Sequence, residues 1–102
     1  IDNSIIQLAN DVRDMVSRAI RSFINTDIKQ AYEVIEFDDE IDEKYSELKK
    51  VLVKTIENSE TKEHTNEYVI LILVLKYLEK IADHAENIAE WIIYNVSGEY
   101  SS

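Results

Sequence analysis

The sequence predicts an all-α fold, a three-helix antiparallel bundle with up-down-up topology. The chain has no proline and a single glycine, so little interrupts a helix. Apolar residues recur every three or four positions along three long segments, and short polar stretches separate those segments. A chain of 102 residues is long enough for one hydrophobic core. We therefore expect residues 1–102 to form a single three-helix domain.

The first segment predicts a helix from Asn3 to Phe23. Its expected core side chains are Ile5, Leu8, Val12, Met15 or Val16, Ala19 and Phe23. The polar residues 25–27 follow, where Thr26 or Asp27 can cap the next helix and Gln30 stands where a capping box needs it. A tight reversal at this point makes the first two helices antiparallel.

The second and third segments predict helices from about Ile28 to Ile56 and from Glu63 or Asn66 to Val96. The expected core of the second is Ala31, Ile35, Ile41 or Asp42, Tyr45, Leu48, Leu52 and Ile56. The expected heptad seam of the third is Leu71, Val74, Leu78, Ile81, Ala85, Ile88 and Ile92. The apolar run 68–75 alone also fits a buried strand, but the helical pattern continues through it and favours a helix.

Two pairs of acids stand out because each pair is spaced by four residues, which places both members on one helix face. Asp38 and Asp42 lie in the second segment, and Glu79 and Asp83 lie in the third. If the chain reverses near residues 60 and 61, Asp42 lies opposite Glu79 and Asp38 lies opposite Asp83. The sequence therefore predicts a patch of four carboxylates on two adjacent helices.

Such a patch needs compensation, since two charges about 5 Å apart repel by about 3 kcal/mol near a protein surface. A bound cation, protonation of some acids, or nearby bases could supply it; the candidate bases are Arg13, Lys44 and Lys80. Carboxylate oxygens suit magnesium, calcium, manganese or iron. Secondary candidates for the same ion are Asp39, His84 and Asn87. The alternative is a structural interaction module whose acids form a solvated docking face for a basic partner, without metal.

Other function classes have little support in the composition. The net charge of −10 disfavours binding to nucleic acid, and the absence of cysteine removes thiolate sites. The longest apolar run has eight residues, whereas a membrane span needs about 20. A ferritin-like di-iron site needs Glu-x-x-His pairs, and neither His64 nor His84 follows a glutamate at that spacing. We therefore expect a protein that is not an enzyme.

The segment 78–91, Leu-Glu-Lys-Ile-Ala-Asp-His-Ala-Glu-Asn-Ile-Ala-Glu-Trp, resembles the C-terminal signature of the PhoU family. In that family a Glu/Asp-x-x-x-Asp pair occurs on the last helix of a three-helix repeat and another on the preceding helix. The matching residues here are Glu79 with Asp83 and Asp38 with Asp42. Residues 27–31 also resemble the start of the family's second helix, so the similarity covers essentially the whole chain.

The resemblance implies a cytoplasmic, membrane-peripheral regulator of phosphate uptake. It implies two partners, the ATPase of a phosphate ABC transporter and a sensor histidine kinase, with which the protein represses the phosphate-starvation response. It also implies multinuclear clusters of metal ions such as iron or zinc at the acid pairs. Family members normally hold two repeats, so we expect this single repeat to be a fragment that exposes an apolar surface near residues 68–75 and forms homo-oligomers.

Overall fold

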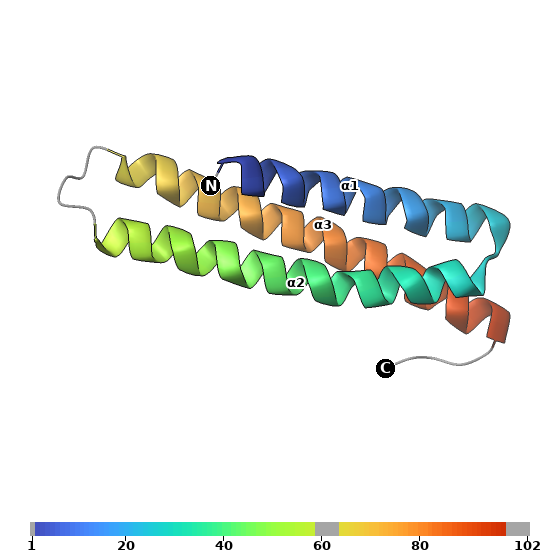
Figure 1. Ribbon diagram of the computed structural model, residues 1–102. Helices are drawn as coiled ribbons and strands as arrows, with labels where there is room; N and C mark the ends of the chain where they lie inside the picture. Colours follow the sequence, from blue (N-terminus) through green and yellow to red (C-terminus); the bar gives the residue numbers. More distant parts are fainter. Residues whose placement is uncertain (1, 59–63, 98–102) are drawn as a thin grey trace.

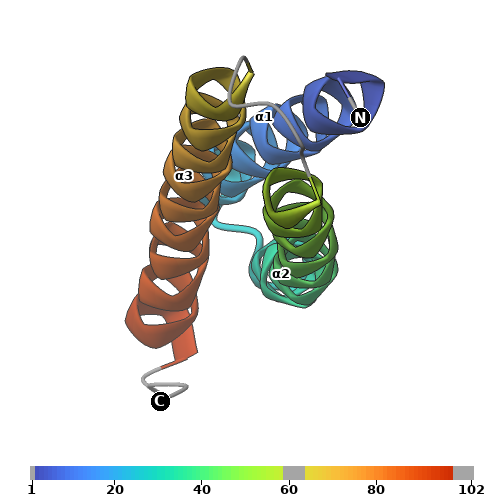
Figure 2. The same cartoon turned by 90° about the vertical axis from the view of Figure 1, so that its left-hand side faces the viewer.

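The computed structural model describes residues 2–58 and 64–97, which form three helices. They are α1 (Asp2–Asn25), α2 (Ile28–Glu57) and α3 (Thr65–Ser97). Successive helices run in opposite directions and lie side by side (Figure 1), and a view along the bundle shows them at the corners of a triangle (Figure 2). The predicted all-α, up-down-up bundle is confirmed. The predicted reversal at residues 60 and 61 and the alternative helix start at Glu63 lie outside the described residues.

None of the three helices is long and apolar enough, over the residues described, to cross a membrane. The apolar run 68–75 is part of α3, where Leu75 is buried and Tyr68 and Leu71 are half-buried, while Val69, Ile70, Leu73 and Val74 are exposed.

The turn between α1 and α2 satisfies the backbone groups of both helix ends. Thr26 has a positive φ of 50°, its N–H donates to Phe23 O, and the Asp27 N–H donates to Ser22 O. This pair of hydrogen bonds is a Schellman C-cap, with Thr26 in the position that glycine usually occupies. Asp27 then caps α2, because its side chain accepts a hydrogen bond from Gln30 N at 3.1 Å. Of the two predicted caps, Asp27 is therefore the one used.

Replacing Thr26 by glycine is expected to raise the free energy of unfolding by about 0.5–1 kcal/mol. A β-branched residue is strained at positive φ, and glycine relieves that strain at some cost in chain entropy. Chemical denaturation of Thr26→Gly measures the gain. The matched control is Thr55→Gly inside α2, expected to lose about 0.3–0.5 kcal/mol, because glycine is a poorer helix former than threonine. If Thr26→Gly loses as much stability as Thr55→Gly, the backbone of Thr26 is not strained in the folded protein.

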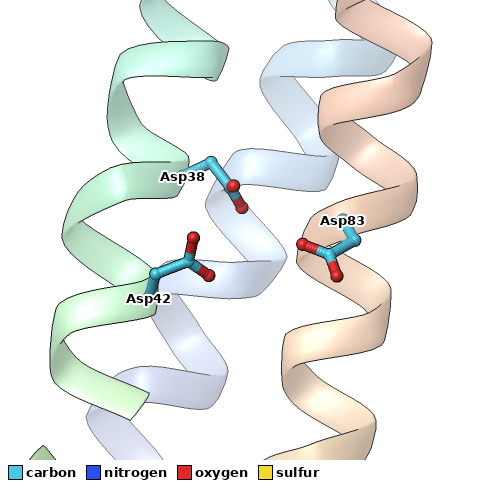
Figure 3. Close-up of side chains that lie close together, drawn as sticks. All are labelled: Asp38, Asp42 and Asp83. Atoms are coloured by element: carbon cyan, nitrogen blue, oxygen red, sulfur yellow. The ribbon is translucent and has the colours of Figure 1, made fainter. Parts of the chain in front are cut away.

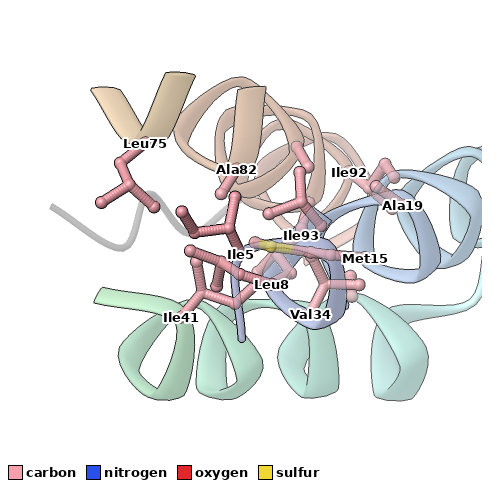
Figure 4. Packing of buried hydrophobic residues seen from close by; sticks show 14 of the residues in the cluster. Ile5, Leu8, Met15, Ala19, Val34, Ile41, Leu75, Ala82, Ile92 and Ile93 are labelled. Carbon is pink, nitrogen blue, oxygen red and sulfur yellow. The ribbon is translucent and has the colours of Figure 1, made fainter. Parts of the chain in front are cut away.

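The core runs the length of the bundle between the three helices (Figure 4). On α1 the predicted residues Ile5, Leu8, Val12, Met15 and Ala19 are all buried. Phe23 was wrongly predicted as core: its side chain is 55% exposed, and Ser22 is buried in its place with its hydroxyl donating to Ala19 O. On α2 the buried residues are Ala31, Val34, Asp38, Ile41 and Leu52, so Val34 replaces the predicted Ile35, which is half-buried.

The predicted seam of α3 is only partly correct. Ala85 and Ile92 are buried and Leu71 and Leu78 are half-buried, but Val74, Ile81 and Ile88 are exposed. Their places in the core are taken by the residues one position further on, Leu75, Ala82 and Ala89, together with Ile93. The cause is that α3 carries two adjacent apolar stripes. The alanines of one stripe leave room for the larger side chains of α1 and α2 to interlock with it.

Candidate metal centre

Three carboxylates from two helices converge between α2 and α3. One oxygen from each of Asp38, Asp42 and Asp83 lies within 4.8 Å of the other two. Asp38 and Asp42 project from successive turns of α2, and Asp83 points toward them from α3 (Figure 3). We call these three residues the carboxylate cluster. Asp38 is 3% exposed, Asp42 is half-buried and Asp83 is exposed, so the cluster is open to solvent on one side.

The position of Asp38 follows from the helical repeat of α2. It lies four residues after buried Val34 and three before buried Ile41, on the stripe that faces the core. Asp42 lies one turn further on and at the edge of the same stripe. Asp83 directly follows buried Ala82, which places it at the side of α3 that borders α2. The bundle therefore forces these acids together.

Negative charge is disfavoured at Asp38 and Asp42, the two members of the cluster on α2. Burial raises the pKa of Asp38 from 3.8 to about 8, with help from a hydrogen bond to Glu86 and from the charges of Glu86, Asp42 and Asp83. Burial, followed by the charges of Asp83 and Asp39, also raises the pKa of Asp42. In the metal-free protein Asp38 is thus protonated at neutral pH and its O–H donates to Glu86.

Two glutamates of α3 extend the acidic surface on either side of Asp83. Burial raises the pKa of Glu79, aided by the charges of Asp83 and Asp42 and opposed by Lys49 and Lys76. Burial likewise raises the pKa of Glu86, against the lowering effect of its hydrogen bond with Asp38. Because the shifts of four carboxyls all oppose ionisation, a bound cation would relieve all of them.

One oxygen of the cluster has no partner. Asp38 Oδ1 is buried and accepts no hydrogen bond from any residue within 2–58 or 64–97. A buried carboxyl oxygen without a donor is costly, and a cation would satisfy it. The three oxygens lie within 4.8 Å of one another, no further apart than two ligands on opposite sides of one ion with bonds of about 2.4 Å, which are separated by about 4.8 Å. The residues present therefore fit a metal ion.

The structure brings together three of the four main predicted ligands. Asp83 lies beside Asp38, the residue expected opposite it, and also faces the turn of α2 from which Asp42 projects (Figure 3). Glu79 lies outside the cluster, but the charge of Asp42, its expected partner, helps to raise its pKa. Among the secondary candidates, Asp39 is exposed and acts on Asp42 through its charge.

His84 and Asn87 lie on a different face. Both line a groove with Ile20, Phe23, Ile88 and Trp91, between α1 and α3. A step of 100° per residue turns His84 away from Asp83, so the cluster offers only oxygen ligands. The expected neutralising bases are also elsewhere: Lys44 forms an ion pair with Asp11 at 2.8 Å, and Arg13 and Lys80 are exposed.

Glu86 is the residue that the sequence prediction missed. It lies seven residues after Glu79 and three after Asp83, so all three share one face of α3. That heptad spacing was available in the sequence. The hydrogen bond between Glu86 and Asp38 could not be predicted from the sequence, because it depends on how α2 and α3 pack.

Comparison with known proteins agrees with the predicted resemblance. Residues 5–92 match the PhoU domain. The chain is 30% identical over 99 residues to a phosphate-specific transport system accessory protein PhoU homolog of Clostridium acetobutylicum, which covers 97% of this chain and 44% of that relative. It is 34% identical over 91 residues to a homolog of the same name from Pseudomonas putida, covering 89% of this chain and 35% of the relative.

A third relative, PhoU homolog 1 of Thermotoga maritima, is 27% identical over 100 residues. The chain spans less than half the length of these relatives. No solved structure matches the chain. The relatives are named as accessory proteins of a phosphate-specific transport system. Since the family's domain matches most of the chain, and the confirmed three-helix bundle carries both acid pairs, the chain belongs to the PhoU family.

Proposed function

We propose that this chain is a metal-binding regulatory bundle of a phosphate transport system. The observation that carries the proposal is the carboxylate cluster, in which the buried oxygen Asp38 Oδ1 has no hydrogen-bond donor among the residues described and faces two further carboxylates. A structural acidic face would keep its acids in water, whereas here one acid is buried at a cost in free energy. A cation offsets that cost.

The ligand set indicates which ions fit. Asp38, Asp42 and Asp83 supply only oxygen, which suits magnesium, manganese or iron better than zinc, a metal that favours nitrogen and sulfur ligands. Glu79 and Asp39 interact with the cluster through their charges and would hold a second ion in a multinuclear site. A bound metal would supply positive charge between α2 and α3. Asp38 and Asp42 of α2 and Asp83 of α3 would hold it, and would thereby link the two helices.

The regulatory role rests on family membership and on the names of the relatives. We place the chain at the cytoplasmic side of the membrane, where it acts with the transporter's ATPase and a sensor histidine kinase to repress the phosphate-starvation response. By holding a metal, Asp38, Asp42 and Asp83 would fix α2 against α3 in the surface that we propose for contact with these partners. Binding of the purified chain to the ATPase, with and without manganese, tests this step. Equal or absent binding in both conditions would count against it.

Metal binding has a direct test in isothermal titration with manganese, magnesium, ferrous iron and zinc. The parent chain is expected to bind manganese or iron most tightly, and the double variant Asp42→Asn with Asp83→Asn is expected to lose at least about 100-fold in affinity, since it removes two of three ligands. Asp14→Asn, an exposed acid of α1, is the matched control and is expected to bind as the parent does. If the parent binds every ion as weakly as the double variant does, the structural docking module is the better description.

A further inference from the structure

A second apolar stripe on α3 lies outside the core. It consists of Ile70, Val74, Tyr77, Ile81, Ile88 and Trp91, each between 38% and 64% exposed. His84 and Asn95 complete the series, whose members alternate at spacings of four and three residues from 70 to 95. That alternation is the heptad repeat by which one helix packs along another. We call these eight positions the outer stripe.

The outer stripe borders a groove between α3 and the C-terminal part of α1. Ile20 and Phe23 of α1 line this groove of about 540 Å³ with His84, Ile88 and Trp91 of α3. The rings of Phe23 and Trp91, which both line the groove, lie 6.5 Å apart between their centroids. A helix packed along the outer stripe would therefore contact α1 as well as α3.

Charge explains why this face suits a second copy of a strongly acidic chain. Two chains of net charge −10 repel unless they meet where acids are absent. Between residues 70 and 91 the acids of α3 are Glu79, Asp83, Glu86 and Glu90. At 100° per residue they fall on the side of α3 opposite the outer stripe. The face toward α1 is thus the one that two copies can share without opposing these acids.

We propose that two copies of this chain pair through the outer stripes of α3, packed antiparallel about a two-fold axis near residues 82 and 83. The stripe is symmetric about that point. Val74 lies opposite Trp91 of the second copy, Tyr77 opposite Ile88, and Ile81 opposite His84. Val74, the smallest of these side chains, thus meets Trp91, the largest. The two copies of His84 flank the axis, and a polar pair at such a position fixes the register of a helix dimer.

The size of the surface is adequate for a stable pair. The outer stripe is roughly 35 Å long at 1.5 Å per residue. With Ile20 and Phe23 added, its exposed apolar side chains offer on the order of 800 Å² per copy, which is the area that one partner contributes to a standard protein interface. The sequence had placed the self-association surface near residues 68–75. The pairing that we propose extends it along α3 from Ile70 to Asn95.

Sedimentation equilibrium tests the pairing. The parent chain is expected to sediment at twice its mass of 11.9 kDa, and Ile81→Glu is expected to weaken the dimer by about 100-fold because it buries a charge beside the axis. Val51→Glu is the matched control, since Val51 is similarly exposed but lies on α2, and its dimer should be unchanged. Emission from Trp91, the single tryptophan, should shift to shorter wavelength on dimerisation of the parent and of Val51→Glu only.

Cysteine cross-linking tests the orientation and does not depend on the folding of a charged variant. The chain has no cysteine, so single replacements report one position each. A mixture of Tyr77→Cys and Ile88→Cys is expected to give the mixed disulfide dimer on oxidation, whereas each alone gives little. Lys76→Cys, on the same helix but off the stripe, is the control. Homodimers of each single variant would overturn the antiparallel register, and a monomeric parent would overturn the pairing.

The pairing is separable from metal binding. Chelator, or the double variant Asp42→Asn with Asp83→Asn, should leave the dimer intact, because the carboxylate cluster lies on the other side of α3. A dimer that dissociates with chelator would overturn this interface, whether or not metal binds to each chain.

Discussion

Asp38→Asn is expected to be more stable than the parent in metal-free buffer at pH 8, by a few kcal/mol. Asparagine keeps the shape of the protonated carboxyl and can donate its amide N–H to Glu86, but it has no charge to bury. The parent instead keeps a proton on Asp38, or buries a carboxylate beside Asp42 and Asp83. Urea denaturation of the two proteins measures the difference. The residue that we propose as a metal ligand thus costs stability when metal is absent.

The difference has a defined pH dependence. In the unfolded chain Asp38 ionises near its ordinary pKa of 3.8, and in the folded chain it ionises near pH 8. Between these values the folded state holds the extra proton, so stability of the metal-free parent falls as the pH rises, by at most about 1.4 kcal/mol per pH unit from this group. The stabilising effect of folded-state protonation is complete below pH 4 and lost above pH 8. Asp38→Asn lacks this contribution. The difference in the free energy of unfolding between Asp38→Asn and the parent should therefore widen from pH 4 to 8 and then level off.

Asp14→Asn provides the control, because Asp14 is exposed on α1 and its replacement changes net charge by the same amount. Its stability should follow that of the parent at every pH. A constant difference between Asp38→Asn and the parent across this pH range would contradict the raised pKa of Asp38.

Divalent metal is expected to raise the thermal transition of the parent by roughly 10–20 °C. An ion that binds only the folded state adds about 2.7 kcal/mol when its free concentration is 100 times the dissociation constant, and 1 kcal/mol corresponds to about 4–8 °C in a domain of this size. Circular dichroism melts with manganese and with chelator measure the shift. The ion is expected to act by replacing the proton on Asp38 and by holding α2 against α3.

Because metal must displace that proton, binding should weaken from pH 8 to pH 6. Asp38→Asn and Asp83→Asn should melt at the same temperature with and without manganese, whereas Asp14→Asn should respond as the parent does. A parent transition that stays unchanged at millimolar metal would contradict a folded-state metal site. A shift of equal size in Asp83→Asn would place the ion elsewhere on the molecule.

The sequence by itself determined the three helices, their order and the pairing of the two acid motifs. Helix periodicity depends on local spacing, and Asp27 carries the capping signal that begins the second helix. The acid pairs were visible because residues four apart share a face wherever the helix lies. Short reversals then allow few ways to bring Asp38 near Asp83.

Only the tertiary structure decided which side of each helix faces the core. On α3 two apolar stripes compete, and the buried one contains Ala82 and Ala89, since small side chains let three helices pack closely, while Ile81 and Ile88 are left exposed. That choice turns Asp83 toward α2 and His84 toward α1. The same packing of the three helices buries Asp38, brings Glu86 close to Asp38 and leaves the outer stripe exposed. Side-chain burial depends on how neighbouring helices fit together and not on spacing within one helix, so the sequence could not show it.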